Sequence, residues 1–489
     1  MTFVKSETAP YIEAFRAQSR SDEPAWLAAK REAALANFGE KGFPTRRQEA
    51  WRFTNLRPLE KTSFASPAEW QLAEDDVAQN IEDRRLAEAG HRVVMVNGRF
   101  SDVLSEIGGL PKGAWLASAA RTLAERPDAF AAAIEETDTV GAQPFASLNA
   151  ALFADGFVLM LEPGVRLEKP IEIVHWSEAT TPGSWHQRNL LVLGEGSSAH
   201  MLESFAGTGS YWANLVTSVR LGKGAMLQHA KLQDEASDAL HFAVMRAHLA
   251  DRSRYETFVL TLGARLSRQD IQPTLEGEGA AVGVNGAYLL RGEQEATTAI
   301  VVDHAAPGGT TRELWKGVVE ERAHGVFLGT IAVRPEAQKT DAQQTNKNLL
   351  LSPRASVDTK PELEILADDV KCAHGATVGE LDESALFYLR ARGIPEAEAR
   401  RMLIEAFAVD ALETLSDASF REYLATHLRR WLVGGEKKVR LMRQSPSPSH
   451  RFAMGPSLSP VGRGAIGTAP SSPSPQRGEG GGEGEGEGA

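Results

Sequence analysis

The residues best suited to chemistry in this sequence are Cys372 and His374, within the stretch ADDVKCAHGATVGELD at residues 367–382. Cys372 is the single cysteine among 489 residues. In an extended strand, residues two apart project from the same face, so we expect the thiol and the imidazole to point together. A thiolate and an imidazole on one face can ligate a soft metal or an iron–sulfur cluster.

This pair cannot hold a cluster by itself, because iron–sulfur clusters usually need four protein ligands, mostly thiolates. Two interpretations therefore remain open. Either the pairing is a structural coincidence, or a second chain completes the coordination. The spacing by itself favours the coincidence.

Composition excludes several classes of protein. The net charge of −12 argues against a general nucleic-acid binder, and no apolar run is long enough to predict a membrane span. A single cysteine rules out an intramolecular disulfide, so we expect a reducing, cytoplasmic setting. The sequence has no G-x-x-x-x-G-K-[ST] motif, and we do not expect the chain to hydrolyse ATP alone.

The elements that position this pair are predicted from a recurring turn. Between residues 151 and 380, an aliphatic residue followed by small or charged residues returns in LEPGV at 161, LGEGSS at 193, LGKGAM at 221 and LADRSR at 249. A turn that recurs at near-constant spacing is what the stacked coils of a β-solenoid require. The pattern favours a solenoid over an ordinary antiparallel β-sandwich.

Helical patterns flank this β core. Residues 1–150 form a helical and mixed N-terminal region, and residues 381–435 are predicted to form a C-terminal helical domain. The Pro-, Ser-, Gly- and Glu-rich residues 436–489 are expected to be a disordered tail. The apolar face of the C-terminal helices is either core or a docking surface; its candidate docking residues are Leu386, Leu389, Met402, Leu403 and Phe407.

Two parts of the sequence resemble the SufB/SufD family of iron–sulfur assembly scaffold subunits. The resemblance is to the SufD branch of this family. Residues 313–415 carry the longer match, including QKTDAQQTNKNLLLSPRASVDTKPELEILADDVKCAHGATVGELD. The segment RRQEAWRFTNL at residues 46–56 resembles the family's E-x-W-R-[FY]-T segment. The resemblance implies a right-handed parallel β-helix core between N-terminal and C-terminal helical regions.

The resemblance also implies partners and a site. The family pairs SufD with SufB through the β-helix, and the C-terminal helical domain carries the SufC ATPase; a homodimer is possible when the chain is alone. The histidine of the family's C-x-H-G segment corresponds to His374, with Cys372 as a secondary ligand. Iron or an iron–sulfur cluster would be bound transiently and shared with SufB. The chain itself would be a non-catalytic scaffold.

Two alternatives to a ligand-bearing scaffold subunit remain. One is a purely structural adaptor in the same complex, in which His374 packs and binds no metal. The other, more remote, is a carbohydrate-active β-solenoid enzyme, which would need clustered carboxylates along one sheet face. No such cluster is visible in the sequence.

Overall fold

A computed structural model describes residues 8–17, 23–62, 64, 74–82, 84–137 and 143–444. The chain divides into two units, residues 1–437 and 438–489, and the first contains the solenoid and the helices packed on it. The described part of the second unit, residues 438–444, forms the end of one helix. The predicted tail therefore lies outside the described residues, except for residues 436–444.

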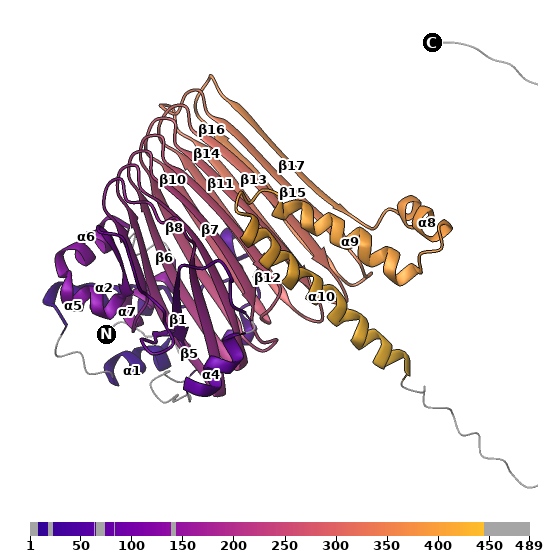
Figure 1. Cartoon of the computed structure of the whole chain (residues 1–489), viewed down its shortest axis with the longest axis horizontal. Helices are drawn as coiled ribbons and strands as arrows, with labels where there is room; N and C mark the ends of the chain where they lie inside the picture. Colours follow the sequence, from indigo (N-terminus) through magenta and orange to yellow (C-terminus); the bar gives the residue numbers. More distant parts are fainter. Residues whose placement is uncertain are drawn as a thin grey trace, which may run out of the picture. The chain divides into compact units, whose positions relative to one another are not determined.

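The centre of the first unit is a parallel β-solenoid, as the recurring turn predicts (Figure 1). Strands alternate between two ladders, so β13 pairs with β11 and β15, and β14 pairs with β12 and β16. Thr310 of β13 lies beside Asp341 of β15, 31 residues further along the chain. The strands are β1 (His91–Val96), β2 (Arg99–Phe100), β3 (Ala114–Ser118), β4 (Phe157–Leu161), β5 (Ile171–Leu193), β6 (Ser198–Leu221), β7 (Met226–Asp234), β8 (Leu240–Leu249), β9 (Arg254–Thr261), β10 (Leu266–Leu275), β11 (Ala281–Leu290), β12 (Glu295–His304), β13 (Thr310–Val319), β14 (His324–Val333), β15 (Asp341–Leu350), β16 (Ser356–Ile365) and β17 (Lys371–Gly379).

The predicted turns stand at the corners of the solenoid. Leu193, Leu221 and Leu249 are the last residues of β5, β6 and β8, and each is followed by a tight turn into the next strand. Gly224 takes a φ of 64° in one of these corners, a left-handed conformation that glycine adopts without steric cost. Arg252 takes a φ of 53° in the next corner, so the backbone geometry repeats where the glycine does not.

The interior between the two ladders contains an apolar column that runs from β1 to the loop before β17. It includes Val93, Leu193, Tyr255, Trp315 and Ala342, all nearly inaccessible to solvent. Burial of apolar area on this scale is the main force that stacks the turns.

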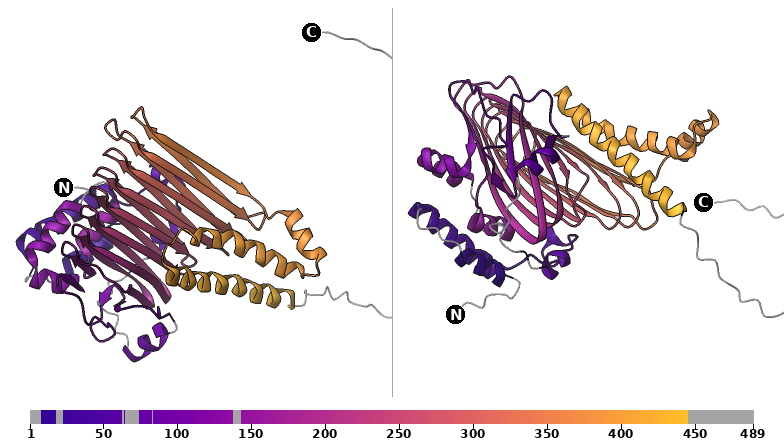
Figure 2. Two further views of the ribbon diagram at one scale, coloured as in Figure 1. Left: turned by 45° about the horizontal axis from the view of Figure 1, so that its top comes forward. Right: turned by 60° about the horizontal axis from the view of Figure 1, so that its bottom comes forward.

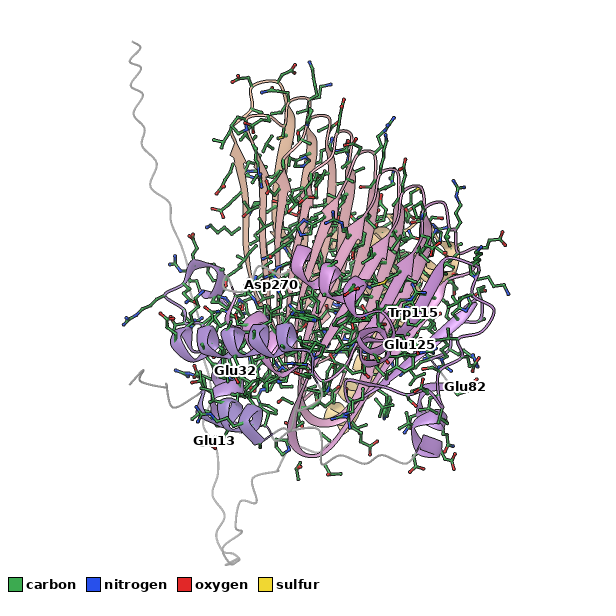
Figure 3. All side chains as sticks on the ribbon, turned by 90° about the vertical axis from the view of Figure 1, so that its left-hand side faces the viewer. Glu13, Glu32, Glu82, Trp115, Glu125 and Asp270 are labelled. Carbon is green, nitrogen blue, oxygen red and sulfur yellow. The ribbon has the colours of Figure 1, made fainter. Side chains whose placement is uncertain are left out.

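Most of the N-terminal helices cover the outer face formed by β6, β8 and β10 (Figure 2), whereas α4 (Glu74–Glu82) packs against β1 and β5. Aromatic side chains make this contact, with Phe145 lying 5.3 Å from Trp212 and 5.1 Å from Phe242 between ring centroids. The outward sides of these helices carry charges of both signs: Glu13, Glu32 and Glu125 (Figure 3) lie on the same helices as the exposed Arg16, Lys41 and Arg121. The elements are α1 (Ala9–Ala17), α2 (Ala25–Lys41), the 3₁₀ helix η1 (Glu49–Trp51), α3 (Arg57–Lys61), α4 (Glu74–Glu82), α5 (Ala119–Glu125), α6 (Pro127–Thr137) and α7 (Pro144–Leu152).

The C-terminal helices α8 (Glu383–Ala391), α9 (Glu396–Leu412) and α10 (Ala418–Gln444) follow β17. Helices α9 and α10 pack on the other outer face, where Ile404 and Leu424 join a cluster with Leu232, Leu260 and Leu289. Much of their apolar surface is therefore core. None of the described helices is both long and apolar enough to cross a bilayer.

Candidate functional site at the open end of the solenoid

The last turn of the solenoid leaves two strand edges open. Strand β16 pairs with β14 and strand β17 pairs with β15, and neither has a partner on its other edge among the described residues. In Figure 1 these strands form the outermost layer of the sheet stack. Apolar side chains are exposed here, including Leu366 (70%) and Val378 (45%). An open strand edge with exposed apolar residues is a template for pairing with another chain.

Cys372 and His374 lie on β17, at this open end. The register pairs Cys372 with Ala342 and His374 with Gln344 of β15, and both of these residues are buried inside the solenoid. In-register parallel strands present paired residues on the same face, so the thiol and the imidazole lie on the inward side of β17. Cys372 is half-buried against the interior column, while His374 is exposed because no further strand covers it.

The environment of Cys372 keeps its thiol protonated. Burial raises its pKa above the ordinary 9.0, and the nearby carboxylate of Asp341 adds to this effect, while a hydrogen bond with the backbone of Ala342 opposes it. A protonated thiol is a weak metal ligand until an incoming cation displaces its proton.

Below His374 the inward position is polar for two further strands. Gln344 lies beside His374, and Glu313 of β13 lies beside Gln344. The side-chain nitrogen of Gln344 donates a 2.9 Å hydrogen bond to Glu313 Oε2. Burial raises the pKa of Glu313 to about 8, and the Gln344 hydrogen bond opposes that rise. At neutral pH this carboxyl group is mostly protonated.

A row of amides continues this polar lining along β15. Asn346 and Asn348, both buried, occupy the next two inward positions, and Asn348 Nδ2 donates a 2.6 Å hydrogen bond to Asn346 Oδ1. The hydroxyl of Tyr288 donates to Asn348 Oδ1 at 2.5 Å. Sequence reasoning missed this lining. The alternation of amides in QQTNKN at residues 343–348 was a signal for it.

Cys372 and His374 do not form a complete metal site by themselves. In the part of the chain that the structure describes, no group of three or more His, Cys, Asp or Glu side chains is arranged to hold a metal ion. A metal bound at the rim of the solenoid, the open edge of β16 and β17 that carries Cys372 and His374, would therefore need ligands from another molecule. The assignment of Cys372 and His374 as metal ligands stays a prediction.

The predicted docking residues of the C-terminal helices differ widely in exposure. Leu386 is buried (3%), and Leu389 is half-buried. Leu403 and Phe407 pack partly against the cluster that holds α9 on the solenoid, and Met402 is 42% exposed. The sequence interpretation missed two neighbours of Leu386.

These neighbours are Phe387 and Tyr388 on α8, which are 73% and 56% exposed. The α8 helix begins after Asp382, whose carboxylate accepts hydrogen bonds from the backbone N–H groups of Ser384 and Ala385. This cap stabilises the start of α8.

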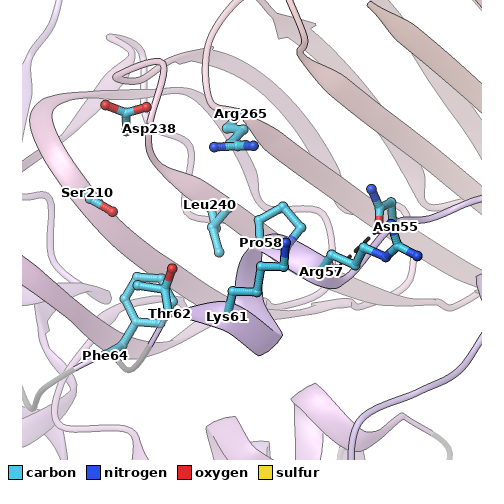
Figure 4. Close-up of a pocket in the computed structure, with 10 residues that line it drawn as sticks. All are labelled: Asn55, Arg57, Pro58, Lys61, Thr62, Phe64, Ser210, Asp238, Leu240 and Arg265. Atoms are coloured by element: carbon cyan, nitrogen blue, oxygen red, sulfur yellow. Dashed lines mark hydrogen bonds between the residues drawn. The ribbon is translucent and has the colours of Figure 1, made fainter.

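A separate cavity of about 470 Å³ lies beside α3, against the turns before β8 and β10 (Figure 4). Arg57, Lys61 and Arg265 line it together with Asp238, so its field favours an anion over a cation. It shares no lining residue with the rim and cannot supply ligands to a metal there.

The segment at residues 46–56 docks on the solenoid. Trp51 is 6% exposed, and its indole lies against the guanidinium group of Arg268. The aromatic side chain is therefore part of the packed core.

Comparisons with known proteins agree with the resemblance. The sequence matches the SufBD core domain of the SUF system for FeS cluster assembly over residues 175–407, and the SufBD protein N-terminal region over residues 5–173. It is 33% identical to an iron–sulfur cluster assembly SufBD family protein of Synechocystis sp., over 82% of this chain and 90% of that protein. It is 30% identical to the iron–sulfur cluster assembly protein SufD of Escherichia coli, over 81% of this chain and 91% of that protein. Identity to the chloroplastic protein ABCI7 of Arabidopsis thaliana is also 30%, over 79% and 82% of the two chains.

Proposed function

Because the chain belongs to the SufBD family of iron–sulfur cluster assembly proteins, we propose that it is the SufD-type subunit of a cytoplasmic scaffold with a SufB-type subunit and a SufC-type ATPase. The chain itself performs no catalysis in this proposal. ATP hydrolysis belongs to the ATPase partner, and the SufB-type subunit shares the growing cluster.

The open end of the solenoid is the observation that carries this proposal. The unpaired edges of β16 and β17 offer backbone hydrogen-bonding groups, and Val378 and Leu366 offer apolar surface beside them. Strand addition to an exposed sheet edge gives affinity through the main chain. We assign this end to the SufB-type subunit, or to a second copy of this chain when no other partner is present.

His374, with Cys372 as a secondary ligand, is proposed to bind iron or a cluster at that junction. The exposed imidazole supplies one nitrogen, and the partner supplies the remaining ligands. The iron and the cluster are cargo that passes through the site. Because the partner must supply the remaining ligands, binding of iron or a cluster depends on assembly of the complex.

The ATPase is proposed to dock on the C-terminal helical domain. Phe387, Tyr388 and Met402 are the exposed large apolar residues of α8 and α9. Such residues anchor protein–protein interfaces. The more buried Leu386, Leu389, Leu403 and Phe407 hold the helices that present them.

The test is to co-express the chain with its two partners and purify the complex anaerobically. We expect wild-type and His374→Ala complexes of equal subunit ratio, measured by mass, with at least tenfold less iron retained by the variant. Equal iron content in the two complexes would refute the ligand role and leave a purely structural adaptor. Family membership sets aside the carbohydrate-active alternative.

A further inference from the structure

We propose that Gln344 and Glu313 form a hydrogen-bonded column beneath His374, and that Glu313 supplies the negative charge that compensates a cation held at the rim. This inference rests on the proposed function, because it takes His374 as the ligand of that cation. Neither Gln344 nor Glu313 touches the cargo. Both act through the polarity and charge of the solenoid interior.

The register of three strands establishes the column. Glu313, Gln344 and His374 occupy paired positions on β13, β15 and β17 and project toward the interior. The 2.9 Å hydrogen bond between Gln344 and Glu313 joins the two deeper members. Both are almost fully buried, at 1% and 4% exposure, while His374 is open to solvent. The column therefore connects the rim to a carboxyl group inside the solenoid.

Strand β14, in the ladder that faces β15, leaves space for the Gln344 side chain. Gly329 of β14 faces Gln344, and a Cβ added there would lie 2.3 Å from the Gln344 side-chain nitrogen. The absence of a side chain at Gly329 thus makes space for the Gln344 amide. A buried amide in a glycine cradle is held in one position, which favours a fixed hydrogen bond to Glu313.

Two oxygen atoms of the column lack partners. Glu313 Oε1 and Gln344 Oε1 make no hydrogen bond within the described part of the chain. Leaving buried polar atoms unpaired is costly, and such atoms in a native fold call for an explanation. A positive charge bound above them would be attracted by both oxygens, and by Glu313 most strongly once it is ionised.

The charge state of Glu313 fits this role. Burial and the Gln344 hydrogen bond account for its pKa of about 8, and no charged side chain contributes to it from β11, β13, β14 or β15. Parallel strands are about 4.8 Å apart, so a cation at His374 is roughly 10 Å from Glu313. At an effective dielectric constant of about 20, a divalent cation at that distance favours the carboxylate on the order of a hundredfold.

Binding then becomes coupled to proton release. When the cation arrives, the O–H bond of the Glu313 carboxyl breaks, the electron pair stays on the carboxylate, and the proton passes to bulk water. Between the lower pKa of Glu313 in the cation-bound state and its pKa of about 8 in the free protein, each bound cation releases up to one proton from Glu313; at still lower pH the carboxyl stays protonated in both states. Above about pH 8 the carboxylate already exists in the free protein, so this release disappears and the affinity levels off.

The experiment uses the purified anaerobic complex of the full chain with its partners, with Fe²⁺ as the probe. Calorimetry in two buffers of different ionisation enthalpy counts the protons released per ion. Infrared difference spectra of wild type against Glu313→Gln identify the C=O band of the protonated carboxyl. We expect this band to vanish from the wild type on Fe²⁺ addition. We also expect Glu313→Gln to bind Fe²⁺ about tenfold more weakly and to release about one proton fewer.

The matched control is Glu364→Gln, which removes an exposed carboxylate of β16 at the same end. It should behave like the wild type. A wild-type band that persists at saturating Fe²⁺, or equal Fe²⁺ affinity in the wild type and Glu313→Gln, would overturn the column's role while leaving His374 as a ligand. Fe²⁺ binding that is unchanged in His374→Ala would instead overturn the proposed ligand, and this inference with it.

Discussion

The guanidinium carbon of Arg268 lies 3.8 Å from the centre of the Trp51 ring, in a contact that joins the 46–56 segment to the solenoid. Arg268 is held in place by both carboxylate oxygens of Asp270, at 2.8 and 3.0 Å, and donates to the hydroxyl of Thr54 at 2.9 Å. Phe145 packs on the indole at 5.4 Å. Trp51 thus packs over the Arg268–Asp270 ion pair and helps to attach the N-terminal region to β10.

Replacing Trp51 with alanine should therefore destabilise the chain. We expect Trp51→Ala to lower the free energy of unfolding by about 3–5 kcal/mol, the usual cost of deleting a buried aromatic side chain. Trp51→Phe keeps a ring over Arg268 and should cost less than half as much. Urea unfolding followed by circular dichroism measures both. A loss below about 1 kcal/mol for the alanine variant would contradict the anchoring role.

A buried carboxylate inside the solenoid should make stability depend on pH. Glu203 accepts hydrogen bonds from His175 at 3.0 Å and His229 at 2.9 Å, and all three side chains are buried. Burial alone would raise the pKa of Glu203, but the two histidines outweigh it and hold the pKa well below the ordinary 4.5. A lowered pKa stabilises the fold above the unfolded-state value and loses that contribution as the pH falls below it.

Glu203→Gln is therefore expected to be destabilising by about 3 kcal/mol at pH 7, since it leaves the histidines without a charged partner. The difference from the wild type should shrink as the pH falls below about 4.5, where unfolding exposes a carboxyl that takes up a proton. Urea midpoints at several pH values give this comparison. A difference that stays constant down to the lowest pH would show that the carboxylate charge does not matter.

Replacing two glycines near the open end with alanine should have different effects on stability. A Cβ at Gly329 would lie 2.3 Å from the Gln344 side-chain nitrogen, whereas a Cβ at Gly375 would meet nothing within 4 Å. We expect Gly329→Ala to push Gln344 away from Glu313 and to destabilise the chain by about 1–3 kcal/mol. Gly375→Ala, the matched control, should leave stability unchanged or slightly raised. Thermal unfolding of the isolated chain tests both, and equal melting temperatures would argue against the cradle.

Much of this fold could be predicted because its signals are local. A turn such as LGKGAM ends one strand and starts the next, so its recurrence revealed the corners without any knowledge of distant contacts. The two-residue spacing of Cys372 and His374 likewise predicted a shared face, which the register confirms. A strand's period of two is enough for this inference.

The features that sequence reasoning missed depend on register between distant residues. Glu313 and Gln344 meet only because β13 and β15 pair with an offset of 31 residues, which the degenerate turn repeat does not specify. The exposure of Phe387 depends on which side of α8 meets the protein, and an amphipathic pattern cannot decide this for a short helix. Pairing and packing, not local propensity, determine both.

The exposed aromatic residues of α8 should matter for binding and not for folding. The proposed ATPase docking predicts that Phe387→Ser with Tyr388→Ser weakens association with the ATPase at least tenfold, because exposed aromatics become interface anchors. Both side chains are more than half exposed, so the unfolding free energy should change by less than about 0.5 kcal/mol. Glu398→Gln on α9 is the control. Unchanged affinity in the double variant would move the docking surface elsewhere.

A charge introduced at the rim of the solenoid should weaken binding of the SufB-type subunit. Val378 is 45% exposed at the end of β17, where the strand edge is open, so Val378→Asp costs little in the isolated chain. In a complex the new carboxylate would be buried against the partner's strand without a counter-ion, which is strongly unfavourable. We expect at least a hundredfold weaker binding of the SufB-type subunit, measured by biolayer interferometry with the purified subunits. Binding of the ATPase should not change. Val103→Asp, which changes an exposed valine (73%) in the N-terminal region, controls for added charge. Normal SufB binding by Val378→Asp would show that the partner sits on another surface.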